Sequence, residues 1–207
     1  MEERSERAAA APFSRELGDW LQSDEPRTLG GLGAVFGERA FAVAILLLMF
    51  PAALPLPTGG LTHVLEVASI IVAAEMVIGF TTIWLPTRWR NRELGGSMTG
   101  RALPFVLRRV TWAERFAKPR GAILLQQQFF RRILGVGLIG LSVGAALAPP
   151  FSGLDTLPAL GAVTLSLGII LGDLLVVGIG AFIGASGIAV TFLLGAAVLN
   201  FFKSLLG

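Results

Sequence analysis

The chain has no cysteine and only one histidine, His63, among its 207 residues. The absence of cysteine excludes disulfides, thiolate catalysis and cysteine-ligated metals. A single histidine excludes a metal site built from histidines alone. The sequence also has no nucleotide-binding loop, zinc signature or nucleophile elbow. We therefore expect no metal, no cofactor and no enzymatic activity.

Charged residues are scarce in the last third of the chain and uneven elsewhere. After position 132 they are Asp155, Asp173 and Lys203. Residues 1–39 carry 5 Arg and 8 Asp/Glu, whereas residues 86–132 carry 11 Lys/Arg and 2 Glu. Positively charged segments of membrane proteins stay in the cytoplasm, so we expect the basic block and the N-terminus there. Topology accounts for this block, and we expect no nucleic-acid partner.

Apolar residues dominate the rest of the chain. It is 54% hydrophobic, and its mean hydropathy of +0.73 is too high for an ordinary soluble domain. The first residues, MEERSERAAAAPFSREL, have no apolar core and do not form a secretory signal. Composition therefore predicts a multi-pass membrane protein.

Two apolar stretches, residues 38–79 and 131–172, align without a gap at an offset of 93 residues. Both have an Arg near the start, an Ala-Ala-Leu-x-x-Pro turn in the middle and Gly-Leu after it. Paired interrupted apolar segments point towards transporter-like architecture. The identical pairs are Arg39/Arg132, Val43/Val136, Leu48/Leu141, Ala52/Ala145, Ala53/Ala146, Leu54/Leu147, Pro57/Pro150, Gly60/Gly153, Leu61/Leu154 and Gly79/Gly172.

We therefore expect an all-α polytopic membrane protein with two tandem helical hairpins in the same orientation. The expected parts are a cytoplasmic segment (1–37) and a membrane domain (38–207), divided into repeat 1 (38–80), a basic interfacial linker (81–130), repeat 2 (131–172) and a C-terminal apolar segment (173–203).

Helix ends and lengths leave several alternatives open. The first helix, near 39–54, is about 23 Å long and falls short of a bilayer core of about 30 Å. The hairpins either span a thinned membrane or are re-entrant.

Thr62 and Asp155 hold equivalent positions and are plausible N-caps. The C-terminal segment is either one tilted helix or two half-helices broken at residues 184–187. The GxxxG pairs Gly140/Gly144 and Gly180/Gly184 indicate close helix packing or self-association.

Two shorter segments have amphipathic patterns. Residues 13–22 place Phe13, Leu17, Trp20 and Leu21 on one stripe, which lies at the membrane interface or docks on the protein itself. Residues 103–117 suit a helix lying in the headgroups of the inner leaflet. The residues expected to meet anionic lipid are Arg108, Arg109, Arg115 and Lys118.

Glu66 and Glu75 lie in the return helix of the first hairpin. An ionisable group at membrane depth is costly and suggests function. His63 and Glu66 share a helix face and can interact, whereas Glu66 and Glu75 lie on opposite faces. The simpler interpretations are a favourable helix N-terminus for Glu66 and an exposed cytoplasmic end for Glu75. We expect Glu75 to be the stronger functional candidate, facing the interior or the cytoplasmic mouth, with Arg39, Arg132 or a cation as partner.

Asp173 and the two equivalent arginines complete the expected binding residues. Asp173 follows Gly172 and is either the N-cap of the last helix or an ion-pair partner of Arg39 or Arg132. Those arginines otherwise extend towards lipid headgroups. The sequence thus gives six candidate binding residues: His63, Glu66, Glu75, Asp173, Arg39 and Arg132.

Five further features of the sequence are Gly-Glu-Arg-Ala-Phe at 37–41, Pro51 with Leu54-Pro55-Leu56-Pro57, Trp84-Leu85-Pro86, Gly153-Leu154 with Leu157-Pro158-Ala159, and Asp173. Together they resemble the ExoD family of bacterial membrane proteins linked to exopolysaccharide synthesis. The resemblance covers about residues 30–200 and implies a bacterial inner-membrane protein associated with exopolysaccharide production. Glu75 departs from it, because an uncharged polar residue such as Gln is expected there.

The expected function is support of exopolysaccharide synthesis or export, as a transporter of a small solute or ion. The alternative is a scaffold or lipid-organising protein with no transport path. A membrane glycosyltransferase ranks third, because the chain offers few clustered acidic residues. The expected partners are anionic lipids, a second copy of the chain and the exopolysaccharide-synthesis machinery.

The charge pattern predicts the labelling of introduced cysteines in intact cells. We expect Ser14→Cys and Ser97→Cys to resist a membrane-impermeant thiol reagent, because both positions lie on the cytoplasmic side. The chain has no cysteine of its own, so background labelling is absent. Labelling of Ser97→Cys from outside would reverse the predicted orientation.

Overall fold

The computed structural model describes residues 13–22, 36–54, 61–84, 103–115, 120–149 and 152–206. Within these ranges the chain is helical and forms no strand, which confirms the all-α expectation. The elements are α2 (Phe13–Gln22), η1 (Gly37–Arg39), α4 (Ala40–Met49), α5 (Leu61–Ile78), α7 (Leu103–Glu114), α8 (Ala122–Gln126), α9 (Gln128–Ala146), α10 (Thr156–Leu171) and α11 (Leu174–Leu206).

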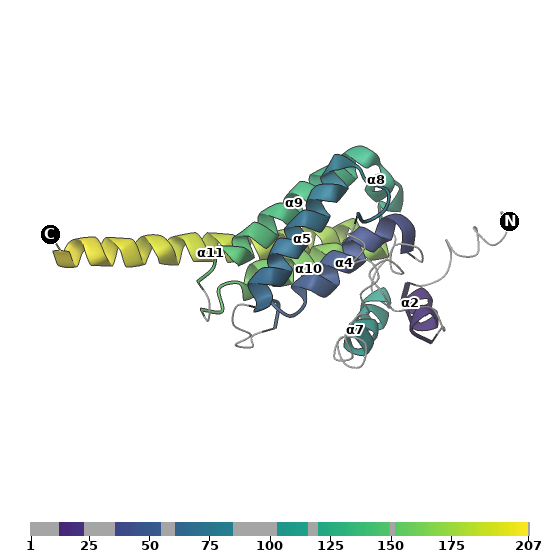
Figure 1. The fold of residues 1–207 in the computed structure, drawn as a ribbon, viewed down its shortest axis with the longest axis horizontal. Coiled ribbons are helices and arrows are strands. Elements are labelled where there is room, and N and C mark those ends of the chain that lie inside the picture. Colours follow the sequence, from purple (N-terminus) through teal and green to yellow (C-terminus); the bar gives the residue numbers. More distant parts are fainter. Residues whose placement is uncertain are drawn as a thin grey trace.

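Helix α4 lies at the centre of the molecule. Its sequence, AFAVAILLLM, is apolar on every side, and all of its residues except Leu48 are buried. A helix that is apolar all round must be covered all round. On one side α5 and α10 cover α4 (Figure 1), and α9 packs against both of these helices. The other side belongs to a separate cluster that includes residues of α2 and α7.

Helices α2 and α7 form a small unit over the outer face of α4. Leu17 and Trp20 of α2 and Val110 of α7 are buried in one cluster with the α4 side chains. The Trp20 ring packs edge-on against Phe36, with ring centroids 6.1 Å apart. The stripe expected on residues 13–22 therefore docks on the protein itself.

Helix α11 is continuous from Leu174 to Leu206, which decides between the two alternatives in favour of one helix without a break at residues 184–187. Glycines there allow close packing instead. A Cβ atom at Gly187 would lie 2.8 Å from the Pro158 backbone nitrogen, and one at Gly184 would overlap Leu141. Small residues at a helix crossing let the two backbones approach. The C-terminal part of α11 extends away from the bundle (Figure 1).

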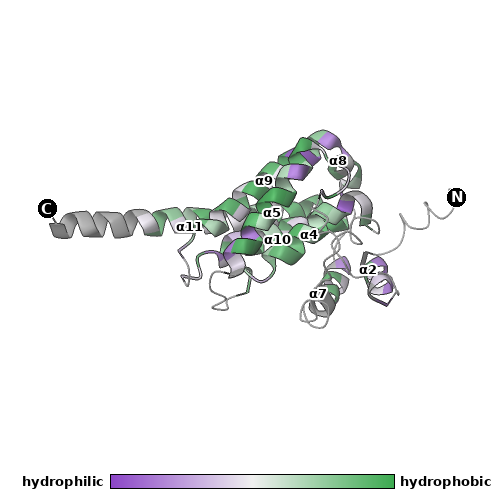
Figure 2. Cartoon of the chain, viewed as in Figure 1, coloured by the Kyte–Doolittle hydropathy of each residue, from purple (hydrophilic) through white to green (hydrophobic). Residues whose placement is uncertain are grey.

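The outer surface of the bundle carries many exposed apolar side chains. They lie mainly on α5, α9 and α11, and Figure 2 shows these helices as largely hydrophobic: Val64, Val67, Ile71, Ile133, Val136, Val143, Ile179, Phe182, Phe192 and Leu193. Two helical stretches, Gln128–Ala146 and Leu174–Gly195, are long and apolar enough to cross a membrane, and only 33% and 22% of their residues are buried. A core helix of a soluble protein would be mostly buried. These features indicate a membrane protein.

Two expected helix caps differ from the structure. Thr62 is the second residue of α5, because that helix already begins at Leu61. Asp155 does precede α10, but its side chain makes no capping hydrogen bond. The expectations about Pro57 and Pro150 lie outside the described residues.

Close packing of α10 on α11 predicts a sharp difference between glycines of α11. A Cβ atom at Gly180 would overlap the Leu165 backbone, whereas one at Gly178 meets nothing within 4 Å. We expect Gly180→Ala to destabilise the protein by about 1–3 kcal/mol, because backbone atoms cannot move aside easily. Gly178→Ala should be neutral or slightly stabilising, since alanine favours helix. Unfolding in detergent measures both, and equal effects would contradict this packing.

Candidate functional site

A stripe of polar residues on α5 points into the apolar bundle. Thr62, Glu66, Ser69 and Glu75 are all buried, although α5 is otherwise mostly apolar. The first three are spaced four and three residues apart, so they share one helix face. Glu75 lies on another face, as the helical spacing predicted.

The Glu66 carboxylate is the most deeply buried charged side chain in the described part of the chain, with 0% of its surface exposed. Its Oε2 atom lies 2.7 Å from Nδ1 of His63, whose side chain is 31% exposed. Its Oε1 atom is buried and has no hydrogen-bond partner in the described part of the chain. The structure thus brings His63 and Glu66 together, with one carboxylate oxygen left unsatisfied. A buried polar atom of this kind calls for an explanation.

Asp155 is the second carboxylate near Glu66. It precedes α10 and lies close enough to Glu66 for the two charges to interact. His63, Glu66 and Asp155 therefore gather near the starts of α5 and α10. Within the described ranges no group of three His, Cys, Asp or Glu side chains has the arrangement of a metal site.

Two serines continue the polar contacts from α5 to α9. The Ser69 and Ser142 hydroxyls lie 3.0 Å apart, and both side chains are fully buried. The Ser142 hydroxyl also lies 3.7 Å from the Met49 sulfur on α4. Sequence analysis missed these serines, because a lone serine in an apolar helix is common and its partner is 73 residues away.

Glu75 is buried, with 6% of its surface exposed, as expected for a residue that faces the interior. Its Oε2 atom accepts a hydrogen bond of 2.8 Å from the backbone N–H of Trp84. The partner is therefore a backbone amide and neither Arg39 nor Arg132. Glu75 ties the segment after α5 back to the helix, and a transport role for it stays a prediction.

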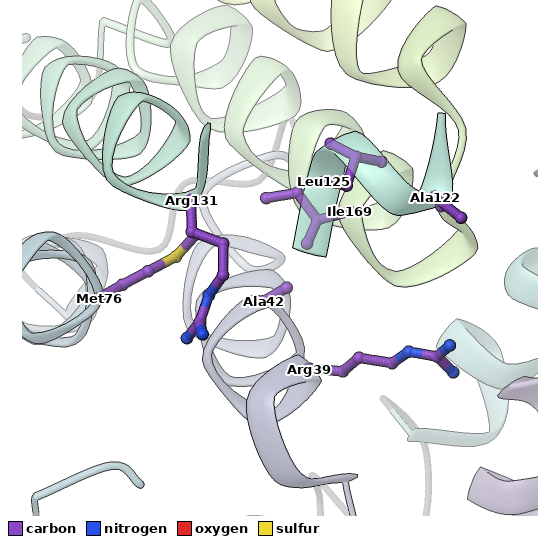
Figure 3. A pocket seen from close by; sticks show the side chains of 8 residues that line it. Arg39, Ala42, Met76, Ala122, Leu125, Arg131 and Ile169 are labelled. Carbon is purple, nitrogen blue, oxygen red and sulfur yellow. The ribbon is translucent and has the colours of Figure 1, made fainter. Parts of the chain in front are cut away.

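The opposite end of the bundle holds a small cavity of about 60 Å³ (Figure 3). The Arg131 side chain extends beside Met76 and Ala42, while Arg39 lies at the rim and reaches away from them. The cavity is bounded by the starts of α4 and α9 and the ends of α5 and α10. Both hairpins therefore begin and end on the same side of the bundle.

The other expected residues at this end are placed less centrally. Arg132 is exposed, whereas its neighbour Arg131, which the sequence did not single out, is half-buried and lines the cavity. Asp173 is buried, and its Oδ1 atom accepts a hydrogen bond from the Leu175 N–H at 2.9 Å, as expected of an N-cap.

Comparison with known proteins identifies the family. The family described as "Exopolysaccharide synthesis, ExoD" matches residues 13–193. The chain belongs to the ExoD family. An uncharacterized protein from Synechocystis is 28% identical over 179 residues, covering 82% of this chain and 81% of that protein. The Rhizobium meliloti protein ExoD is 29% identical over 158 residues, 75% of this chain and 65% of that protein. No solved structure matches the chain.

The family match covers most of the described helices, including the buried polar groups. Residues 13–193 contain both hairpins, the α2–α7 unit and the half of α11 that packs on the bundle. This member of the ExoD family is therefore associated with exopolysaccharide synthesis, as the resemblance implied.

The arginines expected to meet lipid lie on or just after α7. Arg108 and Arg115 are exposed, and their contact with lipid stays a prediction. The side chains of Arg109 and Lys118 lie outside the described part of the chain.

The Glu16 carboxylate of α2 interacts electrostatically with Arg39, which directly precedes α4. Burial raises the pKa of this carboxyl above its usual value, the Arg39 charge lowers it, and the Glu114 charge raises it further. Glu114 itself accepts hydrogen bonds from the Ser14 backbone N–H at 2.9 Å and from the Ser14 hydroxyl. A carboxylate near the first turn of α2 is also favoured by the helix dipole.

The raised pKa of Glu16 predicts a pH-dependent stability difference. The folded state binds this proton more tightly than the unfolded state, so ionising Glu16 costs stability as the pH rises through its pKa. We expect Glu16→Gln to stabilise the protein relative to the natural sequence above pH 4.5, the usual carboxyl value, and not below it.

Thermal unfolding in detergent across pH 4–7 measures this difference. Asp19→Asn is the matched control, because it removes one carboxylate from an exposed position on the same helix. A Glu16→Gln effect that does not change with pH would contradict the assignment.

Proposed function

We propose that this protein is a non-enzymatic inner-membrane component of exopolysaccharide synthesis that carries a small cation, in the simplest case a proton, through its helical bundle. Glu66 is the carrier group in this proposal. The observation that supports it is a fully buried carboxylate with one oxygen on His63 and the other without a partner among the described residues. Ionisable residues in the interior of membrane bundles mark proton and ion pathways.

The partial exposure of His63 gives Glu66 a route to water. The imidazole touches Glu66 and is 31% exposed, so it can pass a proton between water and the buried carboxylate. Asp155 lies near the same entrance and attracts cations to it. In this proposal His63 relays the proton, Glu66 carries it, and Asp155 attracts cations to the entrance.

An apolar layer separates this site from the cavity at the other end. Beyond Ser69 and Ser142, the interior is filled by Ala73, Leu138 and Ile45. Arg131 and Met76 line the cavity past that layer. In the described conformation this apolar layer closes the path between the two polar ends of the bundle. Transport therefore requires the hairpins to move relative to each other.

The size of the interior favours a small ion over a sugar. The cavity of about 60 Å³ holds only a few waters, and a monosaccharide is several times larger than one water. The bundle core is otherwise packed with buried apolar side chains. A small cation is accommodated without opening a sugar-sized path.

We also infer that the two hairpins are parallel copies of one unit. Met49 and Ser142 stand at equivalent positions, 93 residues apart, and touch each other. Gly79 and Gly172, also equivalent, both have positive φ angles of 101° and 68° and end their helices. If a two-fold axis relates the hairpins, equivalent residues that lie on the axis contact each other, as Met49 and Ser142 do. This relation supports a movement of one hairpin relative to the other.

Proton flux into proteoliposomes tests Glu66 as the carrier. We expect Glu66→Gln to lower the flux about a hundredfold, because the amide keeps the size of the side chain but cannot exchange a proton. Glu75→Gln is the matched control on the same helix. It should retain flux, because the Glu75 side chain accepts a hydrogen bond from the Trp84 backbone N–H and is not the carrier in this proposal.

Two results decide between transport and a scaffold without a transport path. Flux that is unchanged in Glu66→Gln, with the variant folded, would contradict the carrier role and favour the scaffold. Loss of flux in Glu75→Gln but not in Glu66→Gln would indicate that Glu75, the candidate that the sequence favoured, is the carrier.

A further inference from the structure

Helix α7 has two faces of different composition, and one of them packs against the described helices. On the inner face Leu107 and Val110 join the cluster with α4, and Glu114 accepts the hydrogen bonds from Ser14 of α2. The inner face therefore holds the only acidic residue of the α7 sequence, LPFVLRRVTWAE.

The outer face combines basic and aromatic side chains. Arg108, Thr111, Trp112 and Arg115 follow one another at helical spacing of three, one and three residues. All four are exposed, Trp112 by 60%, and together with Leu107 they line an open depression. This set is called the α7 stripe below. It carries two positive charges and no negative one.

We propose that the α7 stripe binds the anionic headgroups of the membrane in which the bundle resides. Guanidinium groups pair with phosphate and carboxylate oxygens in a fork geometry, and Trp has an apolar body with a polar tip that suits the headgroup level. A basic helix face with an aromatic residue is typical of a helix lying in the membrane interface.

The position of α7 in the fold supports this partner. Figure 1 places α2 and α7 at the end of the bundle where α4 begins, with their axes running across the direction of α11. In the described part of the chain, α11 is one of two helices that are long and apolar enough to cross a membrane. A helix near the end of the bundle, lying across a spanning helix, runs along the bilayer surface. Ser14 and Glu114 couple α2 to α7, so binding of the stripe also holds α2 over α4.

A spin label on the stripe tests the proposal in the full-length protein. The chain has no cysteine, so Thr111→Cys supplies a unique site for a nitroxide. The labelled protein is placed in nanodiscs of zwitterionic lipid alone or with about a third of phosphatidylglycerol. We expect phosphatidylglycerol to shield the label from a water-soluble relaxation agent, and added salt to reverse the shielding.

Charge removal shows whether the stripe itself is responsible. Arg108→Gln and Arg115→Gln should each lower the docking equilibrium about fivefold, and together about thirtyfold, since one basic residue near an anionic surface contributes about that factor. Arg15→Gln, which removes an exposed charge from α2, is the matched control and should have little effect.

Two outcomes would overturn the proposal. One is a label that stays accessible to the agent in anionic nanodiscs. The other is equal shielding in zwitterionic lipid that neither salt nor Arg108→Gln/Arg115→Gln changes, which would assign the stripe to a protein contact such as a second copy.

Discussion

The need to cover α4 on every side is the constraint on which the rest of the structure depends. This ten-residue helix is apolar all round and too short to span a bilayer core, at about 15 Å against about 30 Å. Neighbouring helices must therefore enclose it. Helices α5 and α10, one from each hairpin, cover one side, and the α2–α7 unit covers the other. An amphipathic unit thus becomes part of the core of a membrane protein.

The polar groups in the bundle matter because the surrounding core is so apolar. Burying a carboxylate without full pairing is costly, and such groups persist in membrane proteins mainly where they serve function. One oxygen of Glu75 accepts a hydrogen bond from a backbone amide, whereas Glu66 has one oxygen on the partly exposed His63 and the other buried without a partner among the described residues. This difference between two carboxylates on one helix is the main reason for assigning the carrier role to Glu66.

Much of the fold could be predicted from the sequence, because its signals are local. Apolar periodicity and composition gave the helix over 13–22, both hairpins and the membrane class, and the spacing of His63 and Glu66 predicted their contact. The sequence left open whether α11 is unbroken, because Gly184 and Gly187 are compatible with a break and their packing against Leu141 and α10 is a tertiary contact. The Ser69–Ser142 contact and the greater burial of Arg131 than of Arg132 depend on tertiary packing, which no single-sequence pattern encodes.

Infrared spectroscopy of the protein in lipid measures most directly whether the Glu66 carboxyl exchanges protons with water. If it does, a carboxyl band absent from Glu66→Gln should change with pH and shift within minutes in D₂O, because His63 connects the buried group to solvent. A Glu66 band that neither titrates nor shifts would contradict the account, and would leave the carboxylate as a purely structural group in a closed bundle.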